Sequence, residues 1–130
     1  MNYRLVAPSR ADTPRIAREW VVLVLRTTGL GHLAERARLC TSEVVTNAYR
    51  HTDTAEIAVE AVLLDGGITV YVYDSAPEHW PGTGRGLLGL STKEGGRGLG
   101  LVAAYADEWA VIAAEGKAKA VWFSLTGAAR

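Results

Sequence analysis

Apolar residues recur at helical spacing over two long segments in the first half of the chain. Pro14 suits the first turn of the first segment, because the N–H group that proline lacks has no helical partner there. Asp12 or Thr13 caps this helix, and Gly29 and Gly31 end it. Its periodic positions are Ile16, Trp20, Leu23, Val24 and Thr27. A second helix is predicted from about Leu33 to Arg50.

The pattern then changes to the alternation of β-strands. Residues 55–64 place alternate apolar side chains on one face, Asp65-Gly66-Gly67 forms a hairpin turn, and a second strand follows. Asp74 continues the alternation of that second strand and therefore lies on its core face, at its end. A short edge strand is expected at residues 3–6, and after a glycine-rich segment we expect a last helix to about Ala106 and two strands. Trp20, Trp109 and Trp122 fall in apolar segments and are predicted to be in the core.

Two polar residues interrupt the apolar face of the second helix. Glu43 and Asn47 are four residues apart, so their side chains share one face of the helix. A carboxylate and an amide beside Val44, Val45 and Ala48 need a polar partner. The pair can serve a metal, a base or an anion site.

Asp74 and the glycine-rich segment are two further candidates. A carboxylate on the buried side of a sheet either caps the turn that follows or binds a ligand. Eight glycines lie between Pro81 and Gly100, and the last of them open a helix. A flexible linker explains such a run, but glycines at a helix start also bring backbone N–H groups to phosphates. A Walker A loop is absent, and the glycines come too late for a dinucleotide fold.

Composition limits the alternatives. A length of 130 residues fits one domain, 1–130. The 14 basic and 14 acidic residues cancel, which favours neither nucleic acid nor an anionic membrane as a partner. The single cysteine, Cys40, excludes an internal disulfide and is interpreted as a small buried hydrophobe. No segment has the length of a signal peptide or a membrane span, so we expect a cytoplasmic protein.

Together, the segment Ser42-Glu43-Val44-Val45-Thr46-Asn47-Ala48-Tyr49-Arg50-His51, the strand ending in Asp74 and the sequence Gly98-Leu99-Gly100 resemble a known family. Their order and spacing are similar to the ATP-binding fold of gyrase, MutL and sensor histidine kinases. Within that group the chain resembles the bacterial anti-sigma-factor serine kinases, whose pattern is Ser-Glu-x-x-Thr-Asn-Ala-x-x-His. The resemblance covers nearly the whole chain. It implies an α/β fold: a two-layer sandwich whose mixed, mostly antiparallel sheet has helices on one face.

The resemblance also assigns roles around ATP and Mg²⁺. Asn47 would hold the metal, Glu43 would be the catalytic base, and Asp74 would accept a hydrogen bond from the adenine amino group. A lid over residues 80–97 would cover the nucleotide. The remaining cofactor-binding residues would be Arg97, Gly98, Leu99 and Gly100. The sequence departs from the family at Ser75-Ala76-Pro77 and at Lys119-Ala120, so we expect an adenine pocket of different shape.

The leading functional hypothesis is a serine/threonine protein kinase that phosphorylates a small antagonist protein and sequesters a sigma factor. The first alternative is a non-catalytic, ATP-responsive module that switches protein partners. A second is an ATPase subunit of a sensor system. Thr69, Tyr71 and Tyr73 lie on the strand face opposite Asp74, which makes that face a candidate surface for a homodimer.

Overall fold

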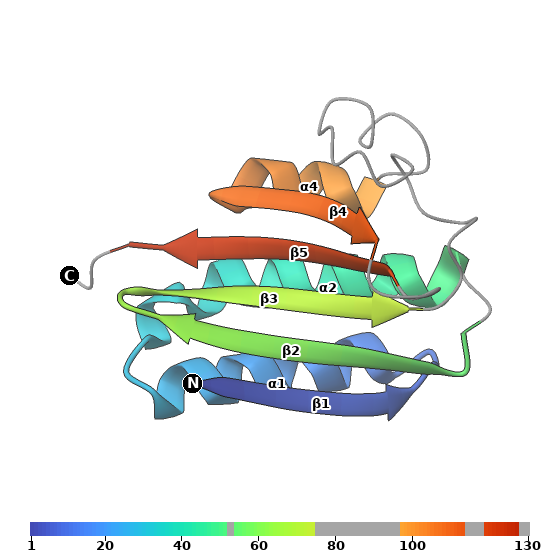
Figure 1. Ribbon diagram of the computed structural model, residues 1–130, viewed down its shortest axis with the longest axis horizontal. Helices are drawn as coiled ribbons and strands as arrows, with labels where there is room; N and C mark the ends of the chain where they lie inside the picture. Colours follow the sequence, from blue (N-terminus) through green and yellow to red (C-terminus); the bar gives the residue numbers. More distant parts are fainter. Residues whose placement is uncertain (52–53, 75–96, 114–118, 128–130) are drawn as a thin grey trace.

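The computed structural model describes residues 1–51, 54–74, 97–113 and 119–127. The elements follow one another along the chain as shown in Figure 1. They are β1 (Asn2–Pro8), α1 (Thr13–Thr27), the 3₁₀ turn η1 (Gly31–Leu33), α2 (Ala34–His51), β2 (Glu56–Leu64), β3 (Gly67–Asp74), α4 (Arg97–Tyr105), β4 (Glu108–Ala113) and β5 (Lys119–Thr126). The predicted edge strand is therefore present and longer than expected.

The strands form one five-stranded sheet in the order β1-β2-β3-β5-β4, and the helices cover one of its faces (Figure 1). This confirms the two-layer α/β sandwich. We expected a mixed sheet, but each pair of neighbouring strands in the described sheet is antiparallel. Two helices separate β1 from β2, so the chain reverses three times and returns antiparallel. α4 and β4 do the same between β3 and β5.

Glycine ends α1 as predicted. Gly29 has a φ of +84°, a left-handed conformation that costs glycine little. The N–H group of Leu30 then donates to the carbonyl oxygen of Leu25 at 2.8 Å, the six-residue bond of a Schellman motif. Leu30 packs against the core, so the motif directs the chain toward α2.

The predicted hairpin between β2 and β3 is also confirmed. Leu64 pairs with Gly67, which leaves Asp65 and Gly66 as a two-residue loop, and Gly66 has a φ of +72°. Gly67 is the first residue of β3, and a Cβ atom there would lie 2.6 Å from the carbonyl oxygen of Leu125. The glycine pair thus serves both the turn and the close approach of β5.

The core lies between the sheet and the helices. Ile57, Val59 and Ala61 on β2 are buried on the face that the alternation predicted. The periodic positions of α1 were assigned less accurately, because Ile16 and Leu23 are exposed. The buried side of α1 is instead formed by Thr13, Pro14, Ala17, Val21, Val22, Val24 and Leu25.

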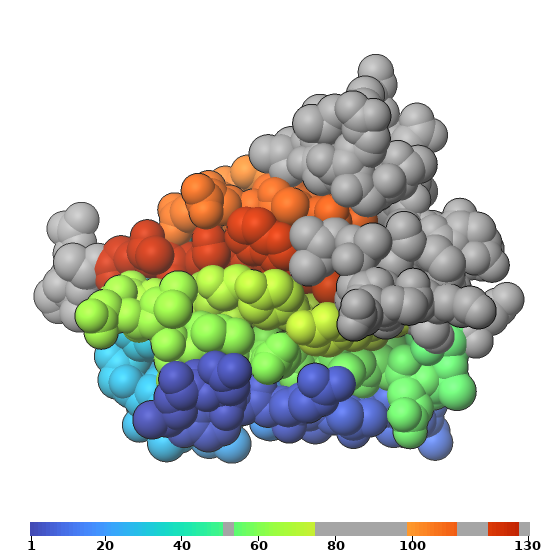
Figure 2. Space-filling view, in the orientation of Figure 1, coloured from blue at the N-terminus to red at the C-terminus, as the bar shows by residue number. Residues whose placement is uncertain are grey.

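Among the described residues, no helix covers the opposite face of the sheet, which forms the surface seen in Figure 2. Trp109 is buried and Trp20 packs partly buried against the core, as expected. The core prediction for Trp122 is wrong. Trp122 pairs with Tyr71 across β5 and β3, and both side chains lie on the open face, since Phe123 takes the core side. Among the described helices, none combines the length and the apolar character that a membrane crossing requires.

Candidate functional site

Glu43 and Asn47 lie on one flank of α2. Both are partly buried, whereas the neighbouring Cys40, Val44 and Ala48 face the core. Helical spacing places the two side chains on the same flank as Arg36, seven residues before Glu43. Arg36 donates a hydrogen bond from Nε to the carbonyl oxygen of Tyr105 at 3.0 Å, so this flank faces α4.

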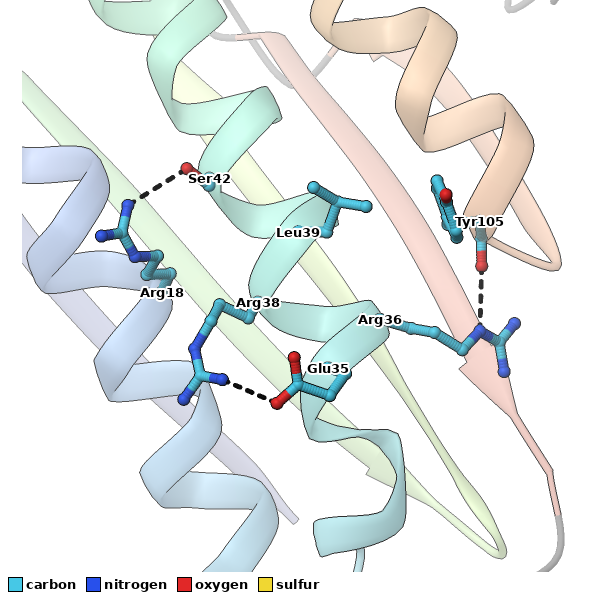
Figure 3. A pocket seen from close by; sticks show the side chains of 7 residues that line it. All are labelled: Arg18, Glu35, Arg36, Arg38, Leu39, Ser42 and Tyr105. Carbon is cyan, nitrogen blue, oxygen red and sulfur yellow. Dashed lines mark hydrogen bonds and ion pairs between the residues drawn. The ribbon is translucent and has the colours of Figure 1, made fainter.

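The start of α4 lies beside the half of α2 that carries these residues. The hydrogen bond from Arg36 to Tyr105 joins the first turn of α2 to the last residue of α4. Because the two helices also pack side by side, they run antiparallel (Figure 3). At 1.5 Å per residue, Leu99 lies about 9 Å back along α4 from Tyr105, and Glu43 lies about 10 Å along α2 from Arg36. The first turn of α4 is therefore level with Glu43, and Asn47 lies about one turn further along α2.

The first turn of α4 is held by Leu99. The Leu99 side chain is fully buried in the core, so the contact with a ligand that we predicted for this residue has to come from its backbone. Gly100 is partly buried, and a Cβ atom added there would meet no described atom within 4 Å. For Arg97 and Gly98 the structure describes only the backbone, which is helical. Residues 80–96 of the predicted lid lie outside the described residues. The same is true of Ser75-Ala76-Pro77.

Asp74 ends β3 at the same end of the molecule. Its side chain is 5% exposed and lies on the core face, in register with Val70 and Val72, as the alternation predicted. Figure 1 shows the end of β3, the last turns of α2 and the start of α4 at one end of the sandwich. The structure thus brings together Asp74, the flank of Glu43 and Asn47, and the helix start predicted to bind phosphate.

The pKa of the Cys40 thiol is shifted by burial and by the charged residues of this flank. Burial raises the pKa of its thiol to about 12, and the nearby charge of Glu43 raises the pKa further, while Arg36 acts in the opposite direction. A thiol with this pKa is protonated at neutral pH and is a poor nucleophile. The interpretation of Cys40 as a buried hydrophobe is confirmed.

These residues fit a nucleotide with a magnesium ion. The described residues hold no cluster of three or more His, Cys, Asp or Glu side chains that would bind a metal without help. Mg²⁺ suits such a place, because it is commonly held by one or two protein oxygens together with phosphates and water. The Asn47 amide would supply one such oxygen, and the N–H groups and helix dipole at the start of α4 favour anions.

Two arginines of α2 were missed by sequence reasoning. Arg36 lies in the first turn of α2, where the helix dipole favours an acid rather than a cation. A cation at this position was the sign in the sequence that Arg36 has partners elsewhere in the fold. Its partners are in α4, before β4 and at the end of β5, so they come together through the fold alone. Arg38 forms an ion pair with Glu19 of α1, which local sequence does not indicate either.

The sequence model of one family, the histidine kinase-like ATPase domain, matches residues 7–125. The match spans every element from the end of β1 to β5 and includes each candidate site residue. No curated protein shows significant similarity to the chain.

Proposed function

The chain belongs to the histidine kinase-like ATPase domain family, and we propose that it is an ATP-binding regulatory serine/threonine protein kinase. Family membership supports ATP binding. The finer assignment rests on the pattern from Ser42 to His51, which resembles the anti-sigma-factor serine kinases. On this proposal the protein phosphorylates a small antagonist protein and sequesters a sigma factor.

One observation carries the proposal. The flank of Glu43 and Asn47, the start of α4 and the buried carboxylate of Asp74 lie at the same end of the molecule. A base, a metal ligand, an anion-binding helix start and an acceptor for an amino group are the groups that a kinase site for ATP requires. Each of them would have a separate task.

Asn47 would hold Mg²⁺ through its side-chain oxygen, and the bound ion would neutralise charge on the phosphates. The backbone N–H groups of residues 97–100 would donate to the phosphates, with the Arg97 charge beside them. Asp74 would accept a hydrogen bond from the adenine amino group, since an ionised carboxylate only accepts. A guanine base has a carbonyl oxygen at that position and would be rejected.

Glu43 would act as the general base. It would take the proton of a substrate serine hydroxyl as that oxygen attacks the γ-phosphorus, and the bond from that phosphorus to the bridging oxygen of ADP would break. ADP would leave with the electron pair of that bond, and the serine would keep the phosphoryl group. General-base catalysis typically contributes about 10²–10⁴ in rate.

Glu43→Gln tests this role, because it keeps the shape of the side chain and removes the base. The assay follows label from γ-labelled ATP with Mg²⁺ to proteins encoded by neighbouring genes. We expect transfer by the wild-type protein, a loss of about 100-fold or more in Glu43→Gln, and no change in Glu108→Gln. Glu108 is an exposed carboxylate on β4 and serves as the matched control.

Two outcomes contradict the proposal. Transfer that survives in Glu43→Gln refutes the general base. ATP binding without transfer to any of the tested proteins refutes the kinase and favours the ATP-responsive binding module.

A further inference from the structure

The outer side of the helix layer contains a groove of about 450 Å³ (Figure 3). α2 forms its floor, with Leu39 at the centre. Arg18 reaches it from α1, and Tyr105 reaches it from α4. Its α2 residues lie in the first half of that helix and Tyr105 is the last residue of α4, whereas β3 ends beside the last turns of α2 and the start of α4.

Arg18 and Arg38 give the groove its charge. Arg18 donates from Nη1 to Ser42 Oγ at 3.3 Å, and Arg38 donates from Nη1 to a carboxylate oxygen of Glu35 at 2.9 Å. Glu19 lies 3.7 Å from Arg18 and 3.5 Å from Arg38 as an ion-pair partner. The side chains of the two arginines are 32% and 30% exposed. Exposed pairs of this kind contribute about 0–1 kcal/mol each, so a ligand can replace them.

Both guanidinium groups retain capacity for a ligand. A guanidinium has five N–H donors in a planar fork that matches a carboxylate. Arg36 differs, because its donors point to two backbone carbonyl oxygens and to Asp107, and it holds the fold together. Arg18 and Arg38 are therefore the two cations of this groove that suit an acidic ligand.

The surrounding helices share this charge. The segment 13–51, which contains α1 and α2, has six arginines and three glutamates, a surplus of three positive charges in a chain whose net charge is zero. The side chains around the groove are also apolar in part. Tyr105 on its wall and Leu101 on the same helix are 45% and 38% exposed. A charged and partly apolar groove between helices suits an amphipathic helix.

We propose that this groove binds an acidic amphipathic helix of a partner protein. Aliphatic side chains of that helix would lie on Leu39 and Tyr105, and its carboxylates would pair with Arg18 and Arg38. The inference rests on the proposed function, since it identifies the class of partner that the protein recruits.

A designed peptide provides the probe. It has 20 residues, leucine at helical spacing and glutamate at the flanking positions, and its matched control carries lysine in place of glutamate. Fluorescence anisotropy measures the affinity of each peptide. We expect the glutamate peptide to bind and the lysine peptide to bind at least tenfold more weakly.

Substitutions in the chain locate the binding surface. The double variant Arg18→Gln with Arg38→Gln should bind the glutamate peptide at least tenfold more weakly. Leu39→Glu places a carboxylate on the floor of the groove and should weaken binding independently. Arg15→Gln and Arg26→Gln remove exposed charges of α1 that do not line the groove and should have no effect.

An unchanged affinity in the double variant overturns the proposal, as does equal binding of the lysine peptide or no binding of either peptide. Displacement of the glutamate peptide by a single-stranded oligonucleotide would assign the groove to nucleic acid instead. ATP binding is measured on the same samples. If the wild-type protein binds ATP and not the peptide, the groove proposal fails alone; if it binds the peptide and not ATP, the proposed function fails alone.

Discussion

At the level of single residues, the start of α4 depends on the large side chain of Leu99 and on the absence of a side chain at Gly100. Leu99 is fully buried and anchors the turn, while Gly100 beside it has open space around its missing Cβ among the described residues. Glycine within a helix costs about 1 kcal/mol relative to alanine. The described residues leave room at Gly100 for the phosphate group that we propose.

Gly100→Ala separates stability from binding. The free energy of unfolding of the variant should be unchanged or slightly higher, because alanine favours the helix by up to about 1 kcal/mol. Its affinity for ATP should fall by about tenfold, which corresponds to about 1.4 kcal/mol. Calorimetric titration and urea denaturation measure the two quantities.

Gly67→Ala provides the contrasting case. Its Cβ atom would lie 2.6 Å from the carbonyl oxygen of Leu125, so it should lower stability by about 1–3 kcal/mol, as overpacking does. Its affinity for ATP, measured on folded protein, should not change. For Gly100→Ala, by contrast, an ATP affinity equal to that of the wild-type protein would contradict the proposed phosphate position at the start of α4.

At the scale of elements, a polar clamp sets the position of α4 on α2. Besides Tyr105, Arg36 binds the carbonyl oxygen of Thr126 and a carboxylate oxygen of Asp107, both at 3.1 Å. Asp107 accepts two more hydrogen bonds from Thr126, from its N–H group at 2.6 Å and from its hydroxyl at 3.1 Å. The clamp joins α2, α4 and β5, and so fixes the level at which α4 begins along α2.

The clamp makes stability depend on pH. The hydrogen bond from the Thr126 N–H group, and then the Thr126 hydroxyl and Arg36, hold the pKa of Asp107 below its ordinary value of 3.8. A lowered pKa means that the stabilisation is complete above the unfolded value and is lost as the pH falls through the folded one. Asp107→Asn should therefore cost about 1 kcal/mol at pH 7, since the carboxylate is partly exposed.

The difference in unfolding free energy between wild type and Asp107→Asn should shrink below pH 3.8. Urea denaturation at several pH values between 7 and 2.5 measures it. A difference that stays constant over this range would show that the charge of Asp107 contributes nothing.

The elements themselves were predictable where the pattern is local. The alternation on β2 and β3 identified the buried faces and the position of Asp74, and glycines marked the ends of α1 and the hairpin. The burial of α1 was less predictable, because Ala17 and Val21 reach the core while the larger Ile16 and Leu23 do not. Side-chain size alone does not show which flank of a helix packs on a sheet.

At the scale of the whole molecule, the sheet has one open face with an aromatic cluster. Tyr71 stacks on Tyr73 with ring centroids 6.2 Å apart and lies 6.4 Å from Trp122. The Arg4 guanidinium carbon lies 5.6 Å from the centroid of the Tyr73 ring, whose hydroxyl donates to Glu60 at 3.0 Å. A second copy of the chain would bury these rings, so we predict a homodimer through this face.

Tyr71→Glu tests the dimer, because it introduces a charge at the centre of the cluster. Sedimentation equilibrium should give a dimer for the wild-type protein and a monomer for Tyr71→Glu. Leu23→Glu, on the exposed side of α1, should remain a dimer. A monomeric wild-type protein, or a dimer lost in Leu23→Glu and kept in Tyr71→Glu, would contradict the prediction.

The candidate site was predictable as separate pieces and not as an arrangement. Spacing along α2 placed Glu43 and Asn47 together, and the glycines marked the start of α4. Their proximity depends on the antiparallel packing of α2 and α4, which Arg36 holds through partners that are distant in the sequence. The groove of Arg18 and Arg38 was not foreseen for the same reason, since three helices build it.

We propose that Asn47 and the start of α4 bind ATP together with Mg²⁺. Calorimetric titration of ATP with and without Mg²⁺ tests it in the wild-type protein, in Asn47→Ala and in Thr46→Ala, the matched neighbour on α2. We expect Mg²⁺-dependent binding that Asn47→Ala abolishes and Thr46→Ala keeps. The same ATP affinity in Asn47→Ala as in the wild-type protein would contradict it.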